Sequence, residues 1–433
     1  MNRYDKKMNS VPKVLVISGN CFSTQKNNGK TLGNIFKNWP KEKLAQLYIY
    51  PEFPNSNVCN NYFRITDTES LKSLLKHNEK CGGVVQLRHE QEDNTKAIVY
   101  KSNWKNWHIS RFAREFIWIG VHWKDGLLNW VNDFKPDIVF YVGSNYAFLS
   151  RMVDSICKAR KIPLIIYCTD DYILPRFTIM PFFHIHRIWI VFWLKKLLNN
   201  NKSKLMTINE FMQETYKLYL HKDSKILMNM IDIPLQCPEY RQKDNIISIL
   251  YIGNLGLNRW KTLGKFADLM SKSQYCNNFC VEVYSGIEPK KDELKYITQT
   301  SCMTYKGSLN KEQVKQKQME ADILLHVEAF DYNSRKNVKL SLSTKITEYM
   351  SAGKPILAIG PKEVASIKFL QKYGGANCIT KLDKKNIHKV LSNMIEFNNR
   401  KNMGITNWES INRIINLNNM DEIIKQSINE LIN

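Results

Sequence analysis

Short, mostly apolar runs alternate with helix-length amphipathic segments along the first half of the chain. The runs cover residues 14–18, 44–50, 138–142 and 164–167. Apolar runs of this length, separated by helical segments, are typical of parallel strands that helices cover on both faces. The first half is therefore predicted to be a doubly wound α/β domain.

The same pattern begins again in the second half, with apolar runs over 249–252, 281–284, 323–327 and 355–359. We place the boundary in the polar, proline-containing stretch 234–245. This predicts Rossmann-like domains over 1–240 and 241–410, followed by a C-terminal helix over 411–433 that packs on the body.

The predicted architecture indicates where a ligand would bind. Doubly wound sheets bind ligands beyond the carboxyl ends of their strands. Two such domains would face a central cleft, so the informative residues are those that follow Ser18, Val142, Tyr167, Ile252 and Val327.

Composition supports a globular protein of two or three domains, since 433 residues exceed one ordinary core and 43% of them are hydrophobic. The net charge of +23 favours anionic partners. The ten cysteines are scattered and form no CxxC pair, so we expect reduced thiols and no metal site. We see neither a signal sequence nor an 18-residue apolar span, and therefore expect a cytoplasmic protein.

Residues 341–361 carry the most chemical information. Ser343 and Thr344 are good N-cap residues, and Gly353 suits the end of the helix that follows. Lys345 and Glu348 lie one turn apart on its edge. A helix N-terminus with a lysine suits phosphate oxygens, and a carboxylate one turn later can accept hydrogen bonds from a ribose. This spacing fits the binding of a nucleotide diphosphate, and it fits an ordinary surface ion pair equally well.

This segment resembles the donor-binding core of family 4 of the retaining glycosyltransferases, which have the GT-B fold, and especially of capsule and surface-polysaccharide enzymes. In that family a lysine and the second glutamate of a Glu-x7-Glu motif hold the donor, before a small-Gly-Lys-Pro turn. Lys345, Glu348 and residues 352–355 match this pattern. The first glutamate is replaced by Leu340, so the resemblance leaves Glu328, after the preceding strand, as its candidate substitute.

Two further loops resemble that family. Residues 253–261, from Gly253 onward, are similar to the glycine loop whose basic residues clamp the donor diphosphate, which implies catalytic roles for Arg259 and Lys261. The alternative is that both are solvated surface cations. Gly307 stands where the family cradles the base with main-chain groups, although an ordinary strand–turn–helix connection explains it equally well.

The first half offers weaker candidates. Gly29 resembles a loop glycine beside the donor phosphates, with a plain turn glycine as the alternative; Thr24 stands where a Walker A motif needs glycine. Asp171, after the strand at 164–167, would cap a helix or orient the acceptor. Asn145 follows the strand at 138–142 and is a further acceptor-side candidate. No bound metal or cofactor is expected.

Two segments combine aromatic and basic residues. Residues 101–130 contain five of the ten tryptophans, and residues 176–208 contain six basic and no acidic residues. This composition suits an interfacial helix on an anionic membrane leaflet. Stacking on single-stranded nucleic acid and burial in an ordinary core are the alternatives. Nucleic acid is the least favoured of these explanations, and we predict that the chain binds no nucleic acid.

The resemblance implies a glycosyltransferase that retains anomeric configuration. Its donor would be a UDP- or GDP-sugar, and its acceptor a glycan or a polyprenyl-linked lipid at the inner face of the membrane. The expected role is surface-polysaccharide biosynthesis. A nucleotide-sugar epimerase of the same fold and a non-catalytic nucleotide-sugar-binding subunit remain alternatives.

Overall fold

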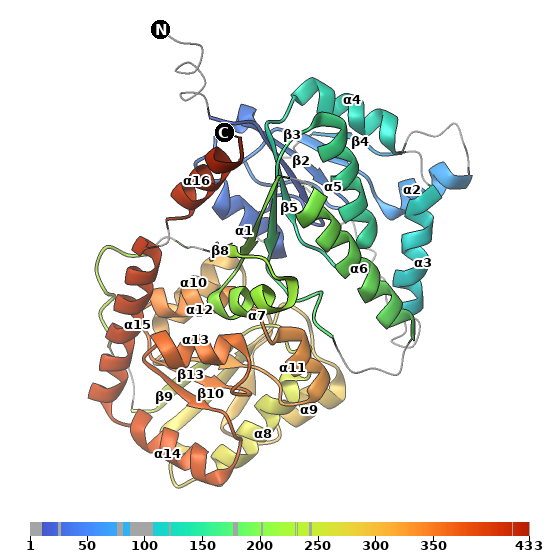
Figure 1. Cartoon of the computed structure of the whole chain (residues 1–433). Helices are drawn as coiled ribbons and strands as arrows, with labels where there is room; N and C mark the ends of the chain where they lie inside the picture. The colour runs from blue at the N-terminus through green and yellow to red at the C-terminus, as the bar shows by residue number, and fades with distance from the viewer. Residues whose placement is uncertain are drawn as a thin grey trace. The chain divides into compact units, whose positions relative to one another are not determined.

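The computed structural model describes residues 11–24, 27–75, 81–86, 107–120, 123–175, 181–200, 202–229, 231, 233–241, 245–417 and 419–432. The chain forms two compact units, of which the first is Met1–Asn229 with Asn419–Asn433 and the second is Met230–Asn418. Each unit has a mainly or wholly parallel sheet flanked by helices (Figure 1). This confirms the predicted fold class of two doubly wound α/β domains. No helix in the described ranges is long and apolar enough to cross a membrane.

The first unit is built on an eight-stranded sheet with the order β4-β3-β2-β1-β5-β6-β7-β8. Its strands are β1 (Val14–Ser18), β2 (Leu44–Tyr48), β3 (Asn61–Arg64), β4 (Gly83–Val85), β5 (Ile138–Val142), β6 (Leu164–Cys168), β7 (Ser203–Thr207) and β8 (Ser224–Ile226). All pairs are parallel except β3 with β4. The strand order reverses beside β1, which pairs with both β2 and β5, so this sheet has a switch point at β1.

Helices surround this sheet, and three of them, α3, α5 and α6, pack against one another (Figure 1). The helices of the first unit are α1 (Asn27–Ile35), α2 (Asp67–Leu75), α3 (Trp107–Gly120), α4 (Lys124–Phe134), α5 (Ala147–Arg160), α6 (Pro181–Asn200), α7 (Glu210–Leu220) and α16 (Met420–Ile432).

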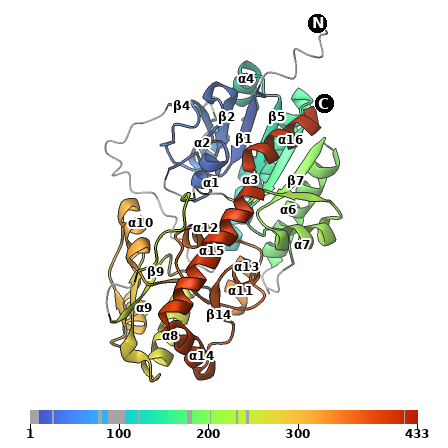
Figure 2. The ribbon, with the colours of Figure 1, turned by 90° about the vertical axis from the view of Figure 1, so that its left-hand side faces the viewer.

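The second unit has a six-stranded, wholly parallel sheet with the order β11-β10-β9-β12-β13-β14. Its strands are β9 (Ile247–Ile252), β10 (Phe279–Tyr284), β11 (Met303–Tyr305), β12 (Ile323–Val327), β13 (Ile356–Ile359) and β14 (Ala376–Ile379). Its helices are α8 (Arg259–Ser271), α9 (Lys291–Ile297), α10 (Lys311–Glu320), α11 (Tyr332–Val338), α12 (Thr344–Ser351), α13 (Ala365–Tyr373), α14 (Lys384–Met394) and α15 (Phe397–Leu417). The long helix α15 packs along α12 (Figure 2).

Polar side chains fix several helix ends. Asn209 accepts a hydrogen bond from the Met212 amide at the start of α7. Asn310 and Gln313 form a reciprocal capping box at the start of α10. Such caps satisfy amide groups that have no partner inside the helix, and they define where each helix begins.

The units divide between Asn229 and Met230, whereas the sequence placed the boundary at residue 240. The segment before 240 belongs to the second unit because Tyr240 is buried there. Its hydroxyl donates to the Asp322 carbonyl at 3.2 Å and accepts from Arg400 Nε at 2.8 Å.

The end of the chain also differs from the prediction of one helix over 411–433. Helix α15 ends at Leu417 and α16 begins at Met420. Helix α16 belongs to the first unit, where Asn38 Nδ2 donates to Asp421 Oδ2 at 2.7 Å and Lys225 Nζ lies 3.1 Å from Glu430 Oε1.

Candidate active site

The loop after β9 places Arg259 at the carboxyl edge of the second sheet. Leu257 and Asn258 adopt left-handed conformations, with φ of 53° and 57°, and Arg259 then begins α8. Asn258 Nδ2 donates to Asp331 Oδ2 at 3.0 Å, which ties this loop to the segment after β12. The turn therefore brings the first side chain of α8 toward the end of β12.

Arg259 pairs with Glu328, the residue directly after β12. Its Nη2 lies 2.8 Å and its Nε 3.0 Å from Glu328 Oε2, and Nε also donates to the Val327 carbonyl at 3.2 Å. The Glu328 side chain is 4% exposed and that of Arg259 is 18% exposed. A guanidinium has five N–H donors, so this pairing orients it and leaves donors for a ligand.

Lys345, in the first turn of α12, reaches the same place from another element. A side-chain carbon added at Gly253 would lie 2.6 Å from Lys345 Nζ and 2.8 Å from the Tyr251 hydroxyl. A side chain at this position would therefore displace the ammonium from its present place. Helix α12 is held against β9 by Tyr349, whose hydroxyl donates to the Ile252 carbonyl at 3.5 Å.

Burial sets the charge of these groups. It lowers the pKa of Lys345 to about 8, and the Arg259 charge acts in the same direction while Glu348 and Glu328 oppose it. Burial also raises the pKa of Glu328, against the opposing Arg259 charge. Burial, with the nearby Arg259 and Lys345 charges, lowers the pKa of His326 to about 3, so this imidazole is neutral.

The amino end of α12 has the expected position but not the expected cap. Ser343 occupies the N-cap position, yet its side chain makes no capping hydrogen bond, and its own amide donates to Ser366 Oγ at 3.3 Å. Thr344 is exposed and Glu348 is half-buried one turn beyond Lys345. Gly353 ends the helix with φ of 62°, as predicted.

The two remaining candidates in this unit lie outside that group of contacts. Lys261 is exposed, and its ammonium lies 5.3 Å from the ring centroid of Trp260. Gly307 has φ of 87°, and its carbonyl accepts from the Ser285 amide at 2.9 Å. Because β11, β10 and β9 are neighbours, Gly307 shares the carboxyl edge of this sheet without touching Arg259 or Lys345 in any described contact.

The candidates of the first unit have visible local roles. Gly29 lies in α1, where a side-chain carbon would stand 2.2 Å from the Cys21 carbonyl oxygen, so close packing requires glycine. Asp171 is buried, and its Oδ1 accepts from the amides of Ile173 and Leu174 at 3.0 Å. Asn145 is half-buried in the turn between β5 and α5.

Sequence reasoning missed His326, which lies in β12 two residues before Glu328. It is buried, its Nε2 lies 3.6 Å from Glu328 Oε1, and that nitrogen has no hydrogen-bond partner among the described residues. A single imidazole inside an otherwise apolar strand was the available signal.

The first unit also has an aromatic and basic group beside the ends of β2 and β5. The hydroxyls of Tyr50 and Tyr146 are 2.9 Å apart, and the Arg114 guanidinium lies 4.2 Å from the Tyr146 ring centroid. Because these residues come from three distant segments, no local sequence motif predicts that they lie together.

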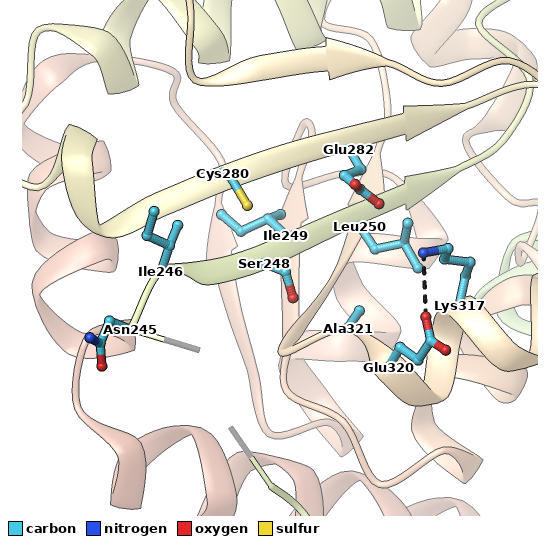
Figure 3. Close-up of a pocket in the computed structure, with 10 residues that line it drawn as sticks. All are labelled: Asn245, Ile246, Ser248, Ile249, Leu250, Cys280, Glu282, Lys317, Glu320 and Ala321. Carbon is cyan, nitrogen blue, oxygen red and sulfur yellow. Dashed lines mark ion pairs between the residues drawn. The ribbon is translucent and has the colours of Figure 1, made fainter. Parts of the chain in front are cut away.

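A groove of about 550 Å³ lies elsewhere in the second unit (Figure 3). It lies along β9 as far as Leu250 and along β10 as far as Glu282, beside α10, and its lining includes neither Arg259, Glu328 nor Lys345. Lys317 and Glu320 form an ion pair at 3.3 Å beside it. The lining residues are Asn245, Ile246, Ser248, Ile249, Leu250, Cys280, Glu282, Lys317, Glu320 and Ala321.

No family model matches the chain, and no curated protein matches its sequence. Its fold is nevertheless shared with solved structures over nearly its whole length. TarM superposes with a TM-score of 0.63 at 11% identity, over 98% of this chain and 99% of that chain. An α,α-trehalose 6-phosphate synthase from Burkholderia multivorans gives 0.60 at 8% identity, over 97% and 99%. WaaG, a glycosyltransferase involved in lipopolysaccharide biosynthesis, gives 0.55 at 10% identity, over 96% and 99%. These likenesses show that the fold is GT-B, as the sequence predicted.

Proposed function

We propose that this chain is a glycosyltransferase that moves a sugar from a UDP- or GDP-sugar to a glycan or polyprenyl-linked acceptor. The observation that carries this proposal is the convergence of Arg259, Glu328 and Lys345 at the carboxyl edge of the second sheet. This is the edge where doubly wound sheets bind nucleotides. Two oriented cations beside a helix N-terminus fit a diphosphate.

The chemistry assigned to these residues is stabilisation of the leaving group. When the sugar–phosphate bond breaks, negative charge builds on the nucleoside diphosphate. Arg259 and Lys345 would neutralise that charge, and Glu328 holds the guanidinium in place. Partial burial of Arg259 and Lys345 strengthens the effect, because less water screens their charges than at a fully exposed site.

We further propose that the transfer retains the anomeric configuration. The acceptor hydroxyl would attack from the leaving-group side, and a donor phosphate oxygen would take its proton. Glu348, one turn beyond Lys345 on α12, would accept hydrogen bonds from the ribose. The sugar–phosphate bond breaks as the new glycosidic bond forms, and the diphosphate leaves with the acceptor's proton.

The structural neighbours support this choice of substrates. One neighbour is S. aureus TarM in complex with UDP and α-GlcNAc-glycerol, and another is a UDP-forming trehalose-phosphate synthase with glucose-6-phosphate. WaaB is a lipopolysaccharide outer core galactosyltransferase. By analogy we place this chain in surface-polysaccharide biosynthesis in the cytoplasm, at the inner face of the membrane.

The decisive experiment is a screen for release of nucleoside diphosphate from common UDP- and GDP-sugars, with and without glycan and polyprenyl-linked acceptors in detergent. Release that requires both donor and acceptor is expected. Conversion of the donor without an acceptor would instead identify an epimerase. Donor binding without any turnover would identify a non-catalytic binding subunit.

Variants then test the site itself. Arg259→Ala and Lys345→Ala should each lower turnover by about 10²–10³-fold, the usual loss when one stabilising donor is removed. Lys389→Ala, an exposed lysine on α14, is the matched control and should behave as the wild type. Wild-type turnover in both site variants would refute the assignment.

A further inference from the structure

Four large apolar side chains of α6 face solvent. Phe182, Ile185, Ile188 and Phe192 are 40%, 42%, 65% and 55% exposed, respectively. Their spacing of three or four residues places them along one side of the helix. A helix on the surface of a globular domain normally turns its polar side outward, so this face is unusual.

Two polar residues of α6 lie on its buried side. His186 and Arg187 are buried: His186 Nε2 lies 3.0 Å from Glu115 Oε1, and Arg187 Nη2 lies 3.4 Å from Asp171 Oδ2. These pairs fix the rotation of α6 in the first unit. The apolar face is therefore held outward by the fold.

Helix α3 extends this apolar surface. Phe116 and Ile119 on α3 are 51% and 53% exposed. Trp189 of α6 joins the two helices, since its ring centroid lies 5.7 Å from that of Phe116 and 5.8 Å from that of Phe112. Six of the eighteen exposed large hydrophobic residues that the structure describes thus lie on two adjacent helices. We call this set the α3–α6 face: Phe116, Ile119, Phe182, Ile185, Ile188 and Phe192.

Charge decides between two possible partners for this face, a second copy of the chain and a lipid membrane. Lys195, one turn beyond Phe192, is exposed, and α6 contains no acidic residue. The whole chain carries +23, so two copies of it repel each other electrostatically. An anionic bilayer offers attraction in place of that repulsion, together with an apolar phase for the phenylalanine and isoleucine side chains.

We infer that the α3–α6 face binds the surface of an anionic membrane. The six apolar side chains enter the headgroup region, and Lys195 meets lipid phosphates. This inference deepens the proposed function and rests on it for its purpose, because a polyprenyl-linked acceptor lies in such a membrane. Residues 101–106, 121–122, 176–180 and 201 of the segments predicted to be interfacial lie outside the described residues.

Sedimentation with vesicles tests the inference. The probes are phosphatidylcholine vesicles and vesicles with about one third phosphatidylglycerol, at low and high salt. The wild type should bind the anionic vesicles and release them partly at high salt. The triple variant Ile185→Ser, Ile188→Ser, Phe192→Ser should bind at least about tenfold more weakly. A second variant of the same face, Lys195→Glu, should weaken binding mainly at low salt.

The controls separate this inference from its rivals. Leu218→Ser, at a 78% exposed leucine of α7 in the same unit, should bind vesicles as the wild type does. Circular dichroism should show unchanged folding of every variant. Equal vesicle binding by the wild type and the triple variant, or none by the wild type, would overturn the inference. The inference would also be overturned if the wild type were a dimer and the triple variant a monomer, because the face would then be an interface between two copies.

A separate assay tests the proposed function. Donor-dependent release of nucleoside diphosphate with a water-soluble acceptor should survive in the triple variant. Release by a wild type that binds no vesicles overturns only the membrane surface, and vesicle binding by a wild type that releases nucleoside diphosphate from no donor overturns only the enzyme assignment.

Discussion

The charge of Lys345 in the candidate site depends on pH just above neutrality. Burial, with a smaller contribution from Arg259, lowers its pKa to about 8, from an ordinary value of 10.5. Below that pH it is an ammonium ion, and above it the neutral amine predominates in the free protein. A bound diphosphate would favour the charged form.

Binding of UDP or GDP should therefore weaken above pH 8. Each further pH unit should cost up to about tenfold in affinity, since the proton lost by Lys345 must be taken up again on binding. His326, with its pKa of about 3, stays neutral throughout, and burial raises the pKa of Tyr251 above its ordinary value. Titration calorimetry from pH 7 to 9 measures how the affinity for UDP or GDP changes with pH. The Lys345→Arg variant keeps its positive charge, so its affinity should change little over this range. A pH dependence equal to that of the wild type would assign the titration to another group.

Gly253 controls the position of the same ammonium. Gly253→Ala places a methyl group 2.6 Å from Lys345 Nζ, closer than any real contact, so the side chain must move. We expect donor affinity to fall by about tenfold or more, as a small misplacement in a preorganised site usually costs. Gly286→Ala is the matched control, because nothing lies within 4 Å of its added carbon. Similar donor affinities for the two variants would show that the close approach has no role.

At the scale of elements, one buried carboxylate joins three helices of the first unit. Glu115 on α3 accepts hydrogen bonds from the amides of Ala147 and Phe148 at the start of α5, at 2.8 and 2.7 Å. It also lies 3.0 Å from His186 Nε2 on α6. A carboxylate at a helix N-terminus replaces the missing intrahelical acceptors and interacts favourably with the helix dipole.

Glu115→Ala should therefore destabilise the first unit by about 1–3 kcal/mol, the usual cost of leaving buried donors without partners. Urea denaturation followed by tryptophan fluorescence measures the change. Glu214→Ala, an exposed glutamate of α7, should leave the free energy of unfolding within about 0.5 kcal/mol of the wild type. Equal stability of both variants would contradict the role assigned to Glu115.

The strands that sequence reasoning identified share a physical property. β1, β5 and β12 are buried along their whole length, so their apolar runs are continuous. Among the strands that it missed, β4, β8 and β14 lie at sheet edges and are largely half-exposed or exposed. β3 and β7 lie inside the first sheet, but each is only partly buried along its length. Edge strands need less apolar surface, and a pattern of hydrophobic residues therefore cannot find them.

At the scale of the whole molecule, the end of the chain returns to the unit in which the chain begins. The buried side of α16 contributes Met420, Ile424, Ile428 and Leu431 to the first unit. Its charged residues reach Asn38 on one side and Lys225 on the other. The first unit is therefore completed only by the last residues of the chain.

The double variant Ile424→Ser, Ile428→Ser should lower the stability of the first unit by about 3–6 kcal/mol, from about 1.5–3 kcal/mol for each buried isoleucine. In calorimetry, we expect the corresponding unfolding transition to move to lower temperature, while the binding of UDP or GDP that we propose for the second unit persists. Gln426→Ser, at an exposed position of the same helix, should have little effect. An unchanged thermogram for the double variant would contradict this division of the chain.

The sequence by itself determined the two α/β domains and the ends of their buried strands. The helix pattern also put Lys345 at a helix start, whereas Arg259 and Glu328 were singled out through the family resemblance, each in a loop that follows a predicted strand. Only the tertiary structure decided that Arg259 pairs with Glu328, that α16 joins the first unit, and that α6 turns its apolar side outward. Each of these depends on contacts between residues far apart in sequence, which chain topology creates and no local pattern records.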